Sequence, residues 1–132
     1  MTGKEELEML RQHKAEIDRI AAERAELEDV LYKCTSRADG MPKCGGGDRM
    51  GALVARVADL QDDLAAELDK YLQVRDLVTA KIGRMKDRRF RDVLVYRYVA
   101  MRTWENVAEC MGRDVRYVYK LHGWALVEYE RL

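Results

Sequence analysis

The 132-residue chain is poor in features that staple secreted domains, span membranes or direct export. Its three cysteines are an odd number without framework spacing, which argues against a disulfide-stapled secreted domain, so we expect free thiols. No run approaches the roughly 18 consecutive apolar residues that would suggest a membrane span. Charged sequence follows Met1–Gly3 directly, without the apolar stretch of a signal peptide. These absences predict a cytoplasmic protein that has no membrane partner.

The chain also has one proline and few β-branched runs, whereas Ala, Leu, Glu, Lys and Arg are abundant. Because these residues favour helices, the composition predicts an all-α fold and excludes a sheet-based enzyme. No nucleophile–base pair, HExxH motif or phosphate-binding glycine loop stands out. Cys34 and Cys44 lack the further nearby ligands that a structural zinc site needs. We therefore expect no catalytic residues, no cofactor and no metal.

Two long amphipathic helices are predicted in residues 1–83, joined by a glycine-rich loop at residues 35–47. The apolar stripe of the second, from Met50 to Met85, alternates steps of three and four through several heptads, as in coiled coils. The loop contains the only proline and four glycines, so neither helix can continue through it. This pattern predicts a long antiparallel hairpin. Its core is thin, which favours pairing with a second copy of the chain.

Charge is distributed unevenly, although the formal sum is zero. A polyanion responds to the local field of the face that it meets, so we expect nucleic acid to bind the basic C-terminal third. We place a domain boundary at Gly83. A basic cluster follows at residues 84–91, and this cluster either clamps a DNA backbone or forms a solvated linker. The net charges are −3 for residues 1–33, +1 for 34–50, −2 for 51–83 and +4 for 84–132.

Residues 84–132 contain three helix-start signals and one helix-stop signal. Asp87 can cap a helix that continues to Val99, Thr103 can cap a second, and Asp114 a third. Gly112 ends the second helix, and two short helices around a tight glycine turn are typical of a helix-turn-helix. The residues expected to face inward in these last two helices are Trp104, Val107, Ala108, Met111, Val118, Leu121, Ala125 and Leu126.

The remaining polar side chains of this segment are the candidate DNA-binding residues. Arg116 and Lys120 lie four residues apart on one helical face, and both can donate to guanine or to phosphates, so we assign them direct readout. Phosphate contacts are assigned to Arg102, Arg113, Tyr117 and Tyr119. We expect Trp104 and Trp124 in the core rather than as stacking platforms. For His122, a phosphate contact and a plain solvated position both stay open.

The stretch Thr103–Gly112, with Val118 and Leu121–Leu126, resembles region 4 of sigma-70-type factors, which reads the −35 promoter element. The whole chain is similar to sigma-like regulators of the ArpU/RinA type from phages and prophages of Gram-positive bacteria. The resemblance implies a transcriptional regulator of the bacterial host cell that binds specific double-stranded DNA. Host RNA polymerase and a second copy of the chain are the further partners it implies. Val115 and Arg116 stand where sigma factors usually have Arg and Glu, so the −35 element itself is not the expected target.

Two other functions fit the same predicted elements. A small-terminase-like DNA-packaging subunit also pairs a helix-turn-helix with a helical oligomerisation hairpin. A protein-interaction adaptor would keep the helix-turn-helix without binding DNA. A ring in solution favours the packaging subunit, a dimer favours the regulator, and the absence of salt-dependent duplex binding favours the adaptor.

Overall fold

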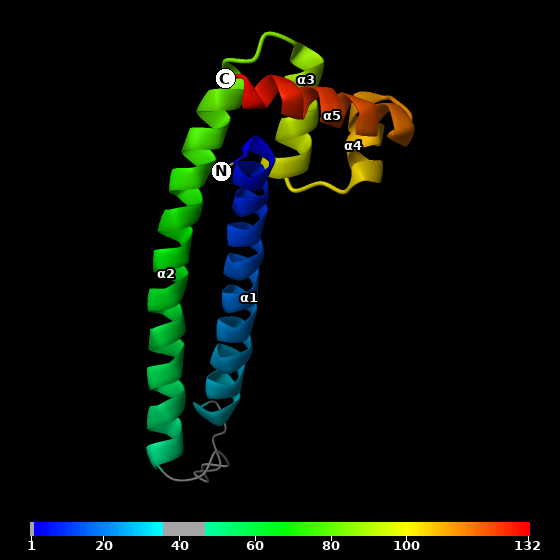
Figure 1. Cartoon of the computed structure of the whole chain (residues 1–132). Coiled ribbons are helices and arrows are strands. Elements are labelled where there is room, and N and C mark those ends of the chain that lie inside the picture. Colours follow the sequence, from blue (N-terminus) through cyan, green and yellow to red (C-terminus); the bar gives the residue numbers. More distant parts are fainter. Residues whose placement is uncertain (1, 36–46) are drawn as a thin grey trace. The chain divides into compact units, whose positions relative to one another are not determined.

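The computed structural model describes residues 2–35 and 47–132, and within these residues all regular structure is helical (Figure 1). The all-α prediction is confirmed. No helix in the described ranges is long and apolar enough to cross a membrane. Most of the predicted glycine-rich loop, including Cys44, lies outside the described residues. The elements are α1 (Gly3–Thr35), α2 (Gly47–Gly83), α3 (Arg88–Leu94), the π-helical turn η1 (Val95–Val99), α4 (Trp104–Met111) and α5 (Val115–Glu130).

The chain divides into two compact units. The two-helix unit is Ala15–Asp69, and the C-terminal unit is Lys70–Leu132 together with Met1–Lys14. The predicted boundary at Gly83 coincides with the end of α2. The C-terminal unit nevertheless reaches past that boundary, because it includes the first turns of α1 and the last turns of α2.

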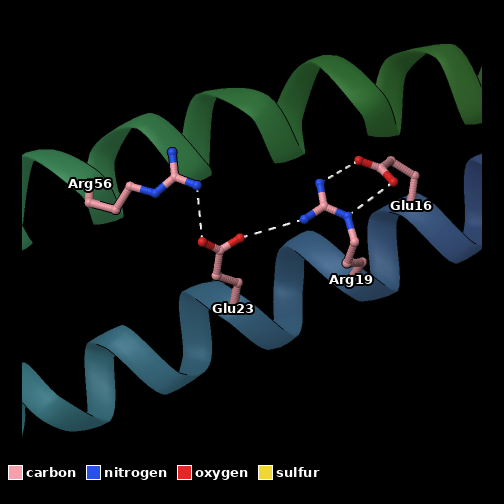
Figure 2. Close-up of polar contacts among 4 residues, drawn as sticks. All are labelled: Glu16, Arg19, Glu23 and Arg56. Atoms are coloured by element: carbon pink, nitrogen blue, oxygen red, sulfur yellow. Dashed lines mark hydrogen bonds and ion pairs between the residues drawn. The ribbon is translucent and has the colours of Figure 1, made fainter.

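The two-helix unit has a narrow apolar seam and a row of surface ion pairs. Ile17, Ile20 and Leu60 are its buried apolar side chains among the described residues. Glu23 of α1 bridges two arginines, with one oxygen 3.0 Å from Arg56 Nη2 of α2 and the other 3.6 Å from Arg19 Nη1 (Figure 2). Exposed pairs of this kind contribute about 0–1 kcal/mol each, so the seam carries most of the stability of this unit.

Cys34, near the end of α1, corrects the expectation of three free thiols. It is disulfide-bonded, whereas Cys110 is an exposed free thiol as expected. The error has a simple cause, because an odd number of cysteines excludes complete pairing but does not exclude a disulfide at any one of them. The disulfide also removes one of the observations on which the expected cytoplasmic location depended.

The helix ends of the C-terminal unit follow the predicted capping signals. The Asp87 carboxylate accepts from the Arg89 amide at 2.9 Å and the Thr103 hydroxyl from the Asn106 amide at 3.2 Å. Asp114 accepts from the Arg116 amide at 3.2 Å. Gly112 adopts a φ of 64°, the left-handed conformation that ends α4 with little strain for glycine. The predicted starts of α3, α4 and α5 and the predicted stop of α4 at Gly112 are therefore confirmed.

The helix expected to run from Asp87 to Val99 changes character at Val95. Residues Val95–Val99 form a π turn, in which the Ala100 amide donates to the Val95 carbonyl at 2.8 Å. Because a π turn holds more residues than an α turn, it displaces the inward face of the helix. Tyr98 stays buried, whereas Val95 is 37% exposed.

A continuous core joins the elements of the C-terminal unit. Of the eight side chains expected to face inward on α4 and α5, Val107, Ala108, Val118, Leu121 and Ala125 are buried, and the other three are half-buried against this core. Three chain segments also meet at the Glu6 carboxylate, which accepts from Lys81 Nζ at 3.0 Å and from the Tyr129 hydroxyl at 2.5 Å. The result is an α5 helix held along its inner face. Leu7 and Leu10 of α1, and Val78, Ile82 and Met85, complete the buried cluster with Val93, Leu94 and Tyr98.

Candidate nucleic-acid interface

Helix α5 buries one face and leaves the opposite face in solvent. The exposed face carries Arg116 and Lys120, which are one helical turn apart. Within the described part of the chain, neither side chain has an ion-pair or hydrogen-bond partner. Both cations are therefore available to a ligand, and the helix beneath them is anchored by its other side. The buried residues of α5 are Val118, Leu121, Ala125 and Tyr129.

Arg113 and Tyr117 lie together on one flank of α5. The Arg113 guanidinium is 5.2 Å from the centroid of the Tyr117 ring. The Tyr117 hydroxyl accepts a hydrogen bond from Arg89 Nη1 of α3 at 2.9 Å. All three side chains line a cavity of about 330 Å³, to which α3, α4 and α5 contribute. We call this the arginine cavity.

Arg102 lies beside the same cavity. Its Nη1 donates to Asn106 Oδ1 at 2.6 Å and to Cys110 Sγ at 3.4 Å, and its guanidinium is 5.8 Å from the Tyr96 ring. Tyr96 and Cys110 themselves line the arginine cavity. Three of the four predicted phosphate contacts, Arg102, Arg113 and Tyr117, are thus brought to one side of the C-terminal unit.

Tyr119 is separated from those three residues. Two positions along an α-helix correspond to roughly 200°, so Tyr119 points away from Tyr117. Its ring makes an edge contact with Trp104 of α4, with the centroids 5.2 Å apart, and it is 47% exposed. It therefore lies on the opposite flank of α5 from Tyr117.

His122 belongs to a cluster of rings rather than to the exposed face. Its Nε2 is 2.6 Å from the Tyr98 hydroxyl, and its ring meets Trp104 edge-on at 4.6 Å between centroids. Burial, with smaller contributions from Lys4 and Arg97, lowers the pKa of His122 to about 4. Burial also raises the pKa of Tyr98 to about 12, so a protonated phenol and a neutral imidazole share this hydrogen bond. This arrangement supports neither a solvated His122 nor a cationic phosphate contact.

The two tryptophans differ in environment. Trp104 is half-buried, with the Arg97 guanidinium 4.3 Å from its centroid, as expected for a core position. Trp124 is 50% exposed, so its expected place in the core is wrong. The reason is its phase on α5, because Trp124 lies four residues after Lys120 and shares the outward side of the helix.

The sequence alone does not decide which role the basic cluster before α4 has in this region. The basic cluster at residues 84–91 was equally compatible with a clamp and a linker, and the structure brings Arg88 and Arg89 of that cluster to the arginine cavity. The local signal was the density of basic residues before Phe90. Their convergence with Arg113, more than 20 residues away, depends on how α3 packs on α5 and has no local signal.

No group of His, Cys, Asp or Glu side chains in the described ranges is arranged to hold a metal ion. Comparison of the chain with family models, with curated proteins and with solved structures finds no match.

Proposed function

We propose that residues 84–132 bind double-stranded DNA through a helix-turn-helix made of α4 and α5, and that the chain is a sequence-specific transcriptional regulator of a phage or prophage. One observation carries the proposal. Arg116 and Lys120 are exposed, unpaired within the described residues and one turn apart on a helix anchored by its opposite face. Long cationic side chains on a rigid, projecting helix are what recognition in a major groove requires.

The chemistry assigned to each residue follows from its position. A major groove about 12 Å wide admits one α-helix, and arginine and lysine both donate to guanine O6 and N7. Arg116 and Lys120 therefore read base edges in this proposal. Arg102, Arg113 and Tyr117 contact phosphates beside one flank of α5 and fix the register, as does Tyr119 on the other flank.

The same proposal gives the predicted antiparallel hairpin of residues 1–83 the role of pairing two copies or contacting host RNA polymerase. Within the two-helix unit, Val54 and Leu68 of α2 are 54% and 42% exposed. They are two heptads apart, so they lie on one helical face. An exposed heptad-spaced face supports association, because apolar surface is removed from water when a second helix covers it.

The test is fluorescence anisotropy of labelled intergenic duplexes from the protein's own genomic neighbourhood, against a scrambled duplex, at about 50 and 200 mM salt. We expect one duplex to be preferred at both salt concentrations. The double variant Arg116→Ala/Lys120→Ala should lose that preference and bind at least about tenfold more weakly, because each base contact contributes about 1–3 kcal/mol of discrimination.

The matched control is Arg49→Ala/Arg131→Ala, which removes the same charge from two exposed positions outside the proposed interface. It should keep the preference of the wild-type chain. Unchanged specificity in the Arg116→Ala/Lys120→Ala variant would refute the assigned readout. A ring-shaped oligomer that binds the scrambled duplex as tightly as the intergenic duplexes would favour the packaging subunit. No salt-dependent binding to any duplex would favour the adaptor.

A further inference from the structure

The arginine cavity holds more positive than negative charge. Arg88 Nε is 3.7 Å from Asp92 Oδ2, and Arg89 Nη2 is 3.2 Å from Asp87 Oδ2. Arg113 has no carboxylate partner within the described residues. Of the three guanidinium groups that line the cavity, two therefore have a carboxylate partner, and Arg113 has none among the described residues. An anionic group in the cavity would pair with Arg113.

Hydrogen-bond donors in the cavity are also left over. The Tyr117 hydroxyl accepts from Arg89 Nη1, so its own proton points elsewhere, and no acceptor for that proton exists among the residues that the structure describes. The Arg113 guanidinium lies over the Tyr117 ring and makes no hydrogen bond with a described residue, so its N–H groups are unused. The cavity thus combines an arginine that has no carboxylate partner with unused N–H and O–H donors, the combination that a phosphate group needs.

We propose that the arginine cavity binds one phosphate group, with Arg113 and Tyr117 as the donors to its oxygens and Arg89 orienting the Tyr117 hydroxyl. The volume of about 330 Å³ leaves room for a phosphate with part of its flanking sugar. A phosphodiester carries one negative charge, which would pair with the Arg113 guanidinium. Free phosphate and a DNA backbone phosphate share this chemistry.

The DNA backbone is the source that we favour, and this part of the inference depends on the proposed function. Arg113 immediately precedes the Asp114 cap of α5, and Tyr117 follows Arg116 by one residue. A phosphate in the cavity would therefore lie beside the helix that presents Arg116 to a groove. Such a contact would set the register of α5 on the duplex without reading its sequence.

The first experiment needs no DNA. The full chain is titrated with dimethyl phosphate, a monoanionic diester, and separately with inorganic phosphate, at constant ionic strength. The arginine Nε–H and backbone N–H signals are followed by NMR. We expect saturable shifts at Arg89, Arg113 and Tyr117. Arg113→Gln should weaken binding about tenfold and Tyr117→Phe severalfold, as expected for hydrogen bonds to a charged group, whereas Arg131→Gln should titrate like the wild-type chain.

Arg113 is exposed and Tyr117→Phe keeps the ring, so both variants should fold, and their amide spectra check this. Shifts that do not saturate, or equal titrations in wild type and Arg113→Gln, would overturn the phosphate site. These outcomes do not depend on whether the chain binds any duplex.

The second experiment identifies the source of the phosphate. On labelled duplexes, Arg113→Gln and Tyr117→Phe should weaken binding to all sequences alike, and Arg113→Gln should reduce the salt slope by about one. Saturable phosphate binding with unchanged duplex affinity in both variants would overturn the backbone as the source and assign the cavity to a free phosphate compound. If the wild-type chain binds no duplex, the proposed function fails. The phosphate titration still shows whether the arginine cavity binds a phosphate group.

Discussion

The two compact units use helices of similar composition but are held together differently. In the two-helix unit, Ile17, Ile20 and Leu60 form a narrow seam beside exposed ion pairs such as Glu23–Arg56. In the C-terminal unit, short capped helices enclose a continuous core on several sides. A binding helix needs the second kind of support, because its side chains must be held within a fraction of an ångström of their targets. The C-terminal unit gives this kind of support to α5, whose buried residues belong to the continuous core.

The largest expected effect is a difference in stability loss between the two cores when one buried leucine in each is replaced by alanine. Leu121→Ala, in the C-terminal unit, should cost about 3–5 kcal/mol, and Leu60→Ala, in the two-helix unit, about 2 kcal/mol. Both leucines are at most 2% exposed, but a seam between two helices can close around a deletion more easily than an enclosed core.

The measurement is urea unfolding of both variants, followed by tryptophan fluorescence and by circular dichroism. Both tryptophans belong to the C-terminal unit, so fluorescence reports on that unit, and circular dichroism reports on all helices. Equal losses of stability for Leu60→Ala and Leu121→Ala would contradict the distinction between a seam and an enclosed core.

An intermediate effect comes from the ring cluster of the C-terminal unit. The pKa of His122 is lowered to about 4 in the folded protein, below its ordinary value of 6.5. The unfolded chain therefore binds a proton first as the pH falls, so this contribution to stability is complete above pH 6.5 and is lost as the pH falls to about 4. Because His122 is only half-buried, we expect a loss of about 1–2 kcal/mol.

Urea unfolding by tryptophan fluorescence across this pH range measures the loss, and His122→Gln provides the control. The variant should show a shallower pH dependence than the wild-type chain. Identical pH profiles for the two proteins would mean that the imidazole is not held neutral by Tyr98 and its surroundings.

The smallest expected effect is in the two-helix unit. Glu23→Gln removes the carboxylate shared by Arg19 and Arg56, whose side chains are 61% and 51% exposed. Exposed pairs contribute little, so we expect less than about 1 kcal/mol, and less still at high salt. Circular dichroism during thermal unfolding at low and high salt measures this, and a large salt-independent loss would show that the ion pairs, rather than the seam, stabilise the unit.

Local chemistry made much of the C-terminal fold predictable. The caps at Asp87, Thr103 and Asp114 and the stop at Gly112 follow from hydrogen bonds within a few residues, and they are confirmed. The common face of Arg116 and Lys120 likewise follows from helical periodicity alone.

Features that depend on packing between distant segments were not predictable. The contact of Tyr98 with His122 joins residues 24 positions apart, and no motif in the sequence marked the π turn at Val95–Val99. The exposure of Trp124 was missed because its aromatic type suggested the core while its helical phase placed it outside. The convergence of Arg89 with Tyr117 had no signal at either position.

The central claim is that the exposed face of α5 reads DNA sequence, and the most direct test is selection from a random-sequence duplex library. The wild-type chain and Arg116→Ala/Lys120→Ala are each used to enrich duplexes over several rounds, and the recovered sequences are compared. We expect a defined motif for the wild-type chain that the double variant no longer enriches. The same motif in both proteins, or no motif in either, would contradict it.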